Sequence, residues 1–238
     1  MMDQEMVTLS KPPVPEEFRI KSYVLRGGRM SNAQRRAYEL LSSRYTIPFT
    51  GKVLDFRALF ANENPVTVEI GFGMGFATAV IAQKNPEKNY LGIEVFRPGI
   101  GRLLWEIEKR GIANIRIIEH DAVEVFTEMV PPASLEGIHL FFPDPWPKKR
   151  HHKRRLVKRP FTDLLARRLG PSGYIYMVTD WADYGEWARG ELSATPGLVN
   201  GYEGFAPPQD WRPRTKFEAK GLQKNHEVRE LLFKTEAP

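Results

Sequence analysis

The stretch that decides the fold is PVTVEIGFGMGFATAVIAQKNP, residues 65–86. It begins as a short β-rich run, breaks into glycines at Gly71, Gly73 and Gly75, and continues as a helix-forming segment that stops at Pro86. Glycines at a strand-to-helix turn let the backbone bend sharply and approach a ligand closely. Their GxGxG spacing is one residue shorter than the GxGxxG fingerprint of dinucleotide-binding proteins. The turn is therefore more typical of a site for S-adenosylmethionine, which brings no pyrophosphate to the helix.

The strand-helix alternation continues beyond this unit. Four further strand-like runs are separated by helical segments: NYLGIEVF (89–96), NIRIIEHDA (114–122), GIHLFFPDPW (137–146) and GYIYMVTDW (173–181). Five strands that alternate with helices predict an α/β fold with a parallel sheet covered on both faces. The end of the chain differs, because two strand-like runs, 215–222 and 227–235, have no long helix between them. They predict an antiparallel hairpin at the edge of the sheet.

The N-terminal region reads differently from the rest of the chain. Residues 1–18 are polar and rich in proline, and residues 19–29 form a basic, partly apolar arm that ends in two glycines. Ser31 and Gln34 have the spacing of a capping box, which predicts a helix that begins at Ser31. We expect a flexible arm over residues 1–30 and a single domain over residues 31–238. No apolar run approaches a membrane span or a signal segment, so we expect a cytoplasmic protein.

Acidic residues follow four successive predicted strands at or near their carboxyl ends. These residues are Glu69, Glu94, Asp121 and Asp144. The carboxyl ends of parallel strands meet at one edge of the sheet, so the four carboxylates are expected to converge on one crevice. There Glu94 can accept hydrogen bonds from both hydroxyls of a ribose, and Asp121 is placed to meet an adenine amino group. Clustered negative charge also favours a cationic sulfonium ligand.

The charge of the chain is concentrated in one place. From Lys148 to Arg159, eight of twelve residues are Lys or Arg and none is acidic. Without these eight cations the net charge of +6 would be −2. A slightly acidic protein with one strongly basic segment indicates a polyanionic partner, and several phosphates of a nucleic acid would suit it.

The composition excludes several classes of site. The chain has no cysteine, which rules out disulfides, thiolate metal sites and cysteine nucleophiles. His151 and His152 are adjacent without a third ligand at suitable spacing, which makes a poor metal site. His120 and His139 lie within strand runs and are expected in the core. We therefore predict no metal.

The loop after the fourth strand, FPDPWPKKRHHKRR (142–155), joins the crevice to the basic segment. Each residue before a proline is pushed toward extended geometry, so Phe142, Asp144 and Trp146 are expected in extended conformations on a stiff loop. The ring of Trp146 offers a flat face on which a base can stack.

Taken in order, several motifs closely resemble one family, the bacterial tRNA (guanine-N7-)-methyltransferases. The motifs are VEIGFGMGFATAVIAQKNP, YLGIEVFRPGIG, HDAVEVF, LFFPDPWPKKRHHKRR, TDW and TKFE. The resemblance runs from about Arg19 to Phe233, and PDPWPKKRHHKRR together with TKFE is its most specific part. It implies the class I S-adenosylmethionine-dependent methyltransferase (Rossmann-like) fold, a seven-stranded, mostly parallel sheet with the last strand antiparallel. It also implies methylation of the variable-loop guanine at position 46 of tRNA, giving 7-methylguanosine and S-adenosylhomocysteine.

The resemblance also assigns residues. The methyl donor would be held by Glu69, Gly71, Gly73, Gly75, Glu94, Asp121 and Asp144, and Asp144 would be the catalytic residue. The guanine or its nucleotide would be contacted by Lys148, Asp180, Thr215, Lys216, Phe217 and Glu218. RNA would be bound by Arg150, His151, His152, Lys153, Arg154 and Arg155. After TKFE the family often has RGxxxGH, where this chain has Asn225 in place of the second glycine, before His226.

The chemistry of guanine N7 narrows the role expected of Asp144. This nitrogen carries an in-plane lone pair and no proton at neutral pH, so it can attack the sulfonium methyl without a general base. Positioning and electrostatics are then the main contributions of the enzyme. We expect Asp144 to orient the base, with Asp180 as the weaker candidate.

Three other functions compete with this interpretation. PDPW superficially resembles the (D/N)PPY loops of enzymes that methylate amino groups, although its prolines and aromatic stand in a different order. A noncatalytic RNA-binding module would retain the basic segment without needing the acids of the crevice. A nicotinamide-dependent oxidoreductase is disfavoured by the GxGxG spacing and by the basic segment. No obligate protein partner is predicted, and the oligomeric state is left open with a monomer slightly favoured.

Overall fold

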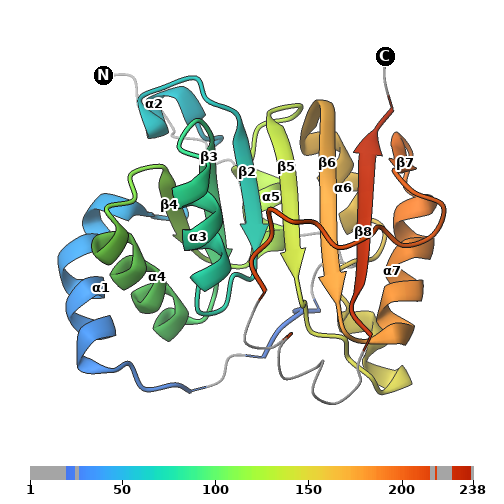
Figure 1. Cartoon of the computed structure of the whole chain (residues 1–238), viewed down its shortest axis with the longest axis horizontal. Coiled ribbons are helices and arrows are strands. Elements are labelled where there is room, and N and C mark those ends of the chain that lie inside the picture. The colour runs from blue at the N-terminus through green and yellow to red at the C-terminus, as the bar shows by residue number, and fades with distance from the viewer. Residues whose placement is uncertain (1–19, 25–26, 215–217, 219–226, 237–238) are drawn as a thin grey trace, which may run out of the picture.

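The computed structural model describes residues 20–24, 27–214, 218 and 227–236. Within them, a twisted sheet of eight strands runs through the middle of the molecule in the order β1-β4-β3-β2-β5-β6-β8-β7 (Figure 1). The strands are β1 (Thr46–Ile47), β2 (Val66–Ile70), β3 (Asn89–Glu94), β4 (Ile115–Glu119), β5 (Leu135–Phe141), β6 (Leu169–Thr179), β7 (Leu198–Asn200) and β8 (Arg229–Thr235). β1 to β6 are parallel, and β8 is antiparallel to both β6 and β7.

The strand order places the glycine turn at the centre of the sheet. From β2 the chain first builds outward through β3 and β4, and then crosses back to place β5 and β6 on the other side of β2. The order therefore reverses between β2 and β5. In open α/β sheets, ligands bind outside the carboxyl ends of the strands at such a reversal.

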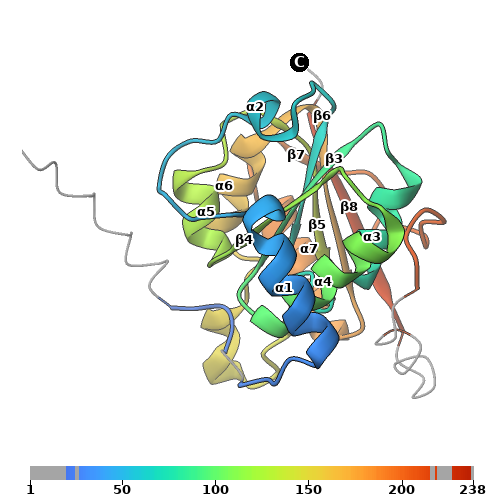
Figure 2. The ribbon, with the colours of Figure 1, turned by 90° about the vertical axis from the view of Figure 1, so that its left-hand side faces the viewer.

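Helices cover both faces of the sheet (Figure 2). α1, α3 and α4 lie on one face, whereas α5, α6 and α7 lie on the other. The helices are α1 (Asn32–Tyr45), α2 (Phe56–Phe60), α3 (Phe76–Lys84), α4 (Arg97–Arg110), α5 (Ala122–Glu128), α6 (Phe161–Arg168) and α7 (Ala182–Ser193), with a 3-10 helix η2 (Lys149–Arg154). The predicted two-sided α/β architecture is confirmed.

Each face of the sheet has its own apolar core, because successive strand residues point to opposite faces. In β6, Ile175 and Met177 pack with α5, α6 and α7, whereas Tyr176 and Val178 pack with α1, α3 and α4. All four side chains are fully buried. A strand buried on both faces reads as a continuous apolar run, which explains why the strands could be found from the sequence.

The predicted capping box of α1 is present. The backbone N–H of Gln34 donates to Ser31 Oγ at 3.3 Å, and the backbone N–H of Ser31 donates to Gln34 Oε1 at 2.7 Å. Two of the helix's otherwise unpaired N–H groups are thereby satisfied, which fixes where α1 begins. In the described residues, no helix is long and apolar enough to cross a membrane.

Two details of the predicted sheet differ from the structure. The two-residue strand β1 adds an eighth strand beside β4, where seven were expected. The predicted hairpin is wrong, because the neighbours of β8 are β6 and the short strand β7 rather than residues 215–222. Of that run, only Glu218 lies within the described residues. Strand propensity marked β8 correctly, but strand pairing depends on contacts that are distant in sequence.

Candidate active site

The glycine turn between β2 and α3 has the backbone geometry that the sequence predicted. Gly71, Gly73 and Gly75 have positive φ angles of 72°, 56° and 68°. A Cβ atom on Gly75 would lie 2.6 Å from Leu103 Cβ, so this glycine allows α3 to approach α4. Cβ atoms on Gly71 and Gly73 would meet nothing within 4 Å. These two glycines therefore leave open space beside the backbone where a ligand can approach.

Gly99, near the start of α4, was not among the predicted site residues. A Cβ atom there would lie 1.9 Å from the carbonyl oxygen of Gly73. Because Gly99 has no side chain, the start of α4 can pack directly against the backbone of Gly73. The glycines of the run RPGIG (97–101) were a visible signal, but the sequence gave no reason to connect them with Gly73.

Glu94, the last residue of β3, holds the glycine turn through its carboxylate. It accepts hydrogen bonds from the backbone N–H groups of Gly73 at 2.8 Å, Val95 at 2.7 Å and Phe96 at 3.0 Å. Burial raises the pKa of Glu94, the three backbone bonds oppose that shift, and the charge of Asp144 adds to it. A carboxylate offers about four acceptor positions. Three are occupied, so one position stays open to a ligand hydroxyl, and the expected contact with both ribose hydroxyls stays a prediction.

Glu69 lies deeper than the other three acids. It is 3% exposed, faces Thr78 of α3, and is not part of the cavity wall that contains Glu94 and Asp144. Burial raises its pKa to about 7, with the Thr78 side chain opposing the shift and the charge of Glu94 reinforcing it.

Asp121 caps α5 and is bound by the N-terminal arm. Its carboxylate accepts a hydrogen bond from the backbone N–H of Val123 at 2.9 Å and one from Lys21 Nζ at 2.7 Å. Lys21 also pairs with Glu124, and although partial burial disfavours its charged form, these partners raise its pKa. The arm is thus attached to the carboxyl edge of β4. Nothing in the local sequence pattern predicted that contact.

A cavity of about 240 Å³ lies at the reversal point of the sheet. Its wall includes Gly71, Glu94 and Asp144, and the arm contributes Ser22 and Tyr23. The structure therefore brings together Glu94 and Asp144, and Ala122, the neighbour of Asp121, lines the same cavity. The expected convergence of acids is correct for these residues, whereas Glu69 lies behind the wall.

The PDPW loop is not extended as predicted. Phe142 and Trp146 have positive φ angles of 52° and 46°, in the left-handed region that non-glycine residues rarely adopt. Tertiary bonds hold them there. The backbone N–H of Phe142 donates to the Val178 carbonyl at 2.8 Å, and Trp146 Nε1 donates to the Ser22 carbonyl at 3.0 Å. Such strain costs about 1–3 kcal/mol per residue and is typical of functional sites. The loop leaves Asp144 exposed at the cavity.

The basic segment divides into exposed and buried cations. η2 and its preceding residue carry exposed side chains at Lys148, Lys149, Arg150 and Lys153. Arg154 lies over the Trp146 ring at 5.1 Å and donates to the Lys21 carbonyl at 3.2 Å. The rings of His151 and Trp146 meet edge to face at 5.9 Å. Burial and then the neighbouring cations lower the pKa of His151.

Arg155 does not fit its expected role as an RNA ligand. Only 1% of the residue is exposed, and its Nε donates to the Pro145 carbonyl at 3.0 Å. It also pairs with Asp183 and lies over the rings of Tyr184 and Trp187. A buried guanidinium cannot reach a phosphate, so Arg155 braces the PDPW loop instead. Charge alone could not separate it from its exposed neighbours.

Glu218 is likewise buried, with 5% of the residue exposed. Arg212 holds it through two bonds, Nη1 to Oε2 at 2.7 Å and Nη2 to Oε1 at 2.9 Å. The same guanidinium donates to Glu230 Oε1 of β8 at 2.6 Å, so it ties Glu218 to the sheet. Arg212 was not predicted, because only tertiary structure brings it to the two glutamates. Asp180 is half-buried directly after β6. Thr215, Lys216, Phe217, Asn225 and His226 lie outside the described residues.

Comparisons with known proteins agree with this geometry. A family model described as "Putative methyltransferase" matches residues 63–231. The chain is 53% identical over 215 residues to the tRNA (guanine-N(7)-)-methyltransferase of Nitrosospira multiformis, which covers 90% of this chain and 94% of the relative. It is 50% identical over 216 residues to the enzyme of that name from Thiobacillus denitrificans, covering 91% of this chain and 95% of the relative. This chain belongs to the tRNA (guanine-N(7)-)-methyltransferase family.

Solved structures place the family's fold among other methyltransferases. The 16S rRNA methyltransferase KamB aligns with a TM-score of 0.57 at 14% identity, covering 79% of this chain and 95% of that one. The antibiotic-resistance methyltransferase Kmr aligns with a TM-score of 0.52 at 13% identity, covering 81% and 95%. At this identity the likeness concerns the fold alone, and it confirms the predicted class I methyltransferase fold. Membership of the family implies use of S-adenosylmethionine.

Proposed function

We propose that this protein transfers a methyl group from S-adenosylmethionine to N7 of the guanine at position 46, in the variable loop of tRNA. The products are 7-methylguanosine and S-adenosylhomocysteine. The observation that carries the proposal is the cavity walled by Glu94 and Asp144, because the loop that carries Asp144 continues directly into the exposed cations of η2. A site for a cationic donor and a surface for a polyanion therefore meet at one loop. We place this reaction in the cytoplasm and in a single domain of residues 31–238.

The residues around the cavity fit the donor. Gly71 and Gly73 leave open space at the turn, and Glu94 retains about one acceptor position for a ribose hydroxyl. His120 and Ala122, which flank Asp121, line the cavity, and the adenine would lie against them. The carboxylates favour the positive sulfonium. When bound, S-adenosylmethionine supplies the methyl group for the reaction.

Asp144 is the catalytic residue of the proposal. Its exposed carboxylate lies on the loop that joins the cavity to η2. It would accept hydrogen bonds from N1–H and the exocyclic amine of guanine and so orient the base for attack by N7 on the methyl group that S-adenosylmethionine would supply. Positive charge moves onto the purine as the new bond forms, and the carboxylate stabilises that charge. The step needs no proton transfer, because N7 carries no proton to be removed.

Recognition of tRNA uses two groups of residues. Lys148, Arg150 and Lys153 present exposed cations that bind phosphates and position the substrate without reading its sequence. Asp180, beside the end of β6, contacts the guanine nucleotide together with Thr215, Lys216 and Phe217 of the segment 215–218. Within that segment, the two bonds from Arg212 fix the direction of Glu218.

The test is methyl transfer from a labelled donor into unmodified tRNA, followed by nuclease digestion and identification of the labelled nucleoside. We expect 7-methylguanosine at position 46 and no incorporation into a tRNA with adenine at that position. Asp144→Asn keeps the size of the side chain and removes its charge, so we expect single-turnover methylation to fall at least tenfold while binding of S-adenosylhomocysteine persists. A different methylated nucleoside would overturn the proposed reaction. An unchanged rate in Asp144→Asn would overturn the proposed role of Asp144.

A further inference from the structure

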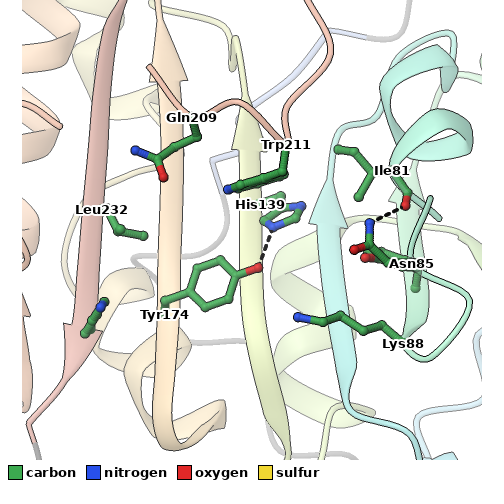
Figure 3. Close-up of a pocket in the computed structure, with 10 residues that line it drawn as sticks. Ile81, Asn85, Lys88, His139, Tyr174, Gln209, Trp211 and Leu232 are labelled. Carbon is green, nitrogen blue, oxygen red and sulfur yellow. Dashed lines mark hydrogen bonds between the residues drawn. The ribbon is translucent and has the colours of Figure 1, made fainter. Parts of the chain in front are cut away.

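A second cavity, larger than the one beside Asp144, lies on the face of the sheet that carries α3 (Figure 3). Its volume is about 330 Å³, within the range of about 300–1,000 Å³ that is usual for small-molecule sites. Tyr90 lies at the start of β3, and Lys234 lies near the end of the antiparallel β8. The cavity is therefore displaced toward the amino ends of the parallel strands. Among the described residues, it shares no wall residue with the cavity at the carboxyl ends.

Aromatic rings form one side of this cavity. The rings of His139 and Trp211 stack with their centroids 5.1 Å apart and their planes 26° apart. Tyr174 extends from β6 toward them, with its hydroxyl 2.9 Å from His139 Nε2 (Figure 3). Tyr90 completes the aromatic lining from β3. Flat rings of this kind favour a planar ligand that can stack or meet them edge to face.

The polar groups of the cavity favour an anion with a hydrogen-bonding edge. Lys88 and Lys234 are its charged residues, and none of the described residues in its wall is acidic. Lys88 pairs with Glu136 at 2.9 Å, whereas the described residues offer no ion pair to Lys234. Asn85 and Gln209 each donate their amide N–H to a backbone carbonyl, of Ile81 and Pro207 respectively. Their side-chain oxygens remain as acceptors for ligand N–H groups.

His139 gives a further indication of a ligand. The residue is 2% exposed, its Nε2 is bonded to Tyr174, and its Nδ1 has no hydrogen-bond partner among the described residues. Burial, followed by the charge of Lys88, lowers the pKa of His139 to about 3, so the ring is neutral. A buried polar atom without a partner is costly, and native structures contain few of them. A polar atom of a ligand, admitted by a shift of Trp211, would satisfy it.

We propose that this cavity is a nucleotide-binding site, in which a planar base lies beside Trp211 and Tyr174 and the phosphate is bound by Lys234. The site is separate from the proposed methyl-transfer site and does not depend on it. The same chemistry is offered by a free mononucleotide and by an unpaired nucleotide of an RNA chain. Two arms of one experiment distinguish these sources.

The first arm measures binding of guanosine and adenosine monophosphates by calorimetry. The full-length protein is saturated with S-adenosylhomocysteine, so that the donor cavity is filled. For a free nucleotide we expect a dissociation constant below about 1 mM. Lys234→Glu reverses an exposed charge at the cavity and should weaken binding about tenfold or more. Lys52→Glu makes the same change at an exposed lysine outside the cavity and should leave binding unchanged.

Further variants separate this site from the methyl-transfer site. Trp211→Leu removes the stacking ring and should also weaken binding, whereas Asp144→Asn should leave it unchanged. If Trp211→Leu fails to fold, Lys234→Glu still decides the matter, because the side chain of Lys234 in β8 is exposed. Binding that is lost in Asp144→Asn and kept in Lys234→Glu would place the nucleotide in the methyl-transfer site and overturn the proposal.

The second arm uses photocrosslinking of unmodified tRNA to the protein saturated with S-adenosylhomocysteine, followed by peptide mapping. Crosslinks to the peptide that contains Trp211, reduced in Lys234→Glu and not in Lys52→Glu, would identify an unpaired RNA nucleotide as the ligand. Calorimetric binding without such crosslinks would identify a free nucleotide. If the protein shows neither a dissociation constant below about 1 mM for the mononucleotides nor a crosslink at Trp211, the site is refuted.

Discussion

Arg155→Lys tests whether this arginine braces the PDPW loop or binds RNA. The substitution keeps the positive charge and removes the forked guanidinium. Arg155 is 1% exposed, donates from Nε to the Pro145 carbonyl at 3.0 Å, and lies over two aromatic rings. Pro145 directly follows Asp144, so this bond fixes the part of the loop that carries the carboxylate proposed to be catalytic. A phosphate ligand would tolerate lysine, whereas a brace with this geometry would not.

The expected magnitude follows from the contacts that are lost. A hydrogen bond from a charged donor contributes about 1.5–3 kcal/mol, and each cation–π contact adds about 0.5–2 kcal/mol. The pair with Asp183 adds little, because 64% of the Asp183 side chain is exposed. Since lysine retains part of these contacts, we expect a loss of about 2 kcal/mol in the free energy of unfolding and a fall in Tm of about 4–8 °C. Loss of about 1.4 kcal/mol of positioning at Asp144 would lower kcat about tenfold.

The assay combines urea denaturation, single-turnover methylation of tRNA, and binding of tRNA over a range of salt concentrations. Exposed Arg150 is the matched comparison. Arg150→Lys should change none of these quantities, and Arg150→Gln should reduce the salt slope by about 0.7–0.9 with Tm unchanged. Arg155→Lys should lower Tm and kcat with the salt slope unchanged. Wild-type stability and turnover in Arg155→Lys would refute the bracing role, as would a flatter salt slope in Arg155→Gln.

Three other predictions follow from buried groups. Gly99→Ala places a methyl group 1.9 Å from the Gly73 carbonyl oxygen and should weaken S-adenosylhomocysteine binding at least tenfold, measured by calorimetry. Gly190→Ala, whose methyl group would meet open space beside α7, should instead raise the free energy of unfolding by about 0.5–1 kcal/mol. Burial raises the pKa of Glu69 to about 7 in the folded protein, above the ordinary value of 4.5. The folded state therefore binds this proton more tightly than the unfolded state does. The resulting contribution to stability is complete below pH 4.5 and is lost as the pH rises through 7. Urea titrations should therefore show stability falling by up to about 3 kcal/mol more in wild type than in Glu69→Gln between pH 4.5 and 8, and parallel curves would contradict this. Arg212→Met leaves two buried glutamates without their cation and should cost about 3–5 kcal/mol, measured as a fall in Tm, while an unchanged Tm would show that the cluster does not hold the segment.

Local patterns predicted most of the sheet and the helices that cover it. β2, β3, β4, β5 and β6 are buried on both faces and read as apolar runs, and α1 begins at its predicted capping box. The prediction of strand pairing failed for β8, whose neighbours in the sheet are distant in sequence. β8 pairs with β6 on one side and with β7 on the other, and β7 was not predicted because a three-residue strand is too short to carry its own periodic pattern.

The candidate site was predictable where residue type and strand position were sufficient. Glu94 and Asp144 follow from acids at strand ends, because every parallel strand delivers its carboxyl end to the same edge. Glu69, Arg155 and Glu218 show the limit of that reasoning, since each is a charged residue whose burial depends on the elements packed around it. Proline spacing alone also misjudged the loop, whose positive φ angles at Phe142 and Trp146 are held by tertiary bonds.

The sequence by itself determined the α/β alternation, the glycine turn, the acids of the crevice and the basic segment, because these depend on residue type and short spacings. Only the tertiary structure decided which charged side chains are exposed to a ligand and which are buried in contact with a partner. It attached the arm to Asp121 through Lys21, enclosed Arg155 beneath the PDPW loop and paired Glu218 with Arg212. The physical reason is that the cost of burying a charge is set by its partners, and those partners come from parts of the chain that only folding brings together.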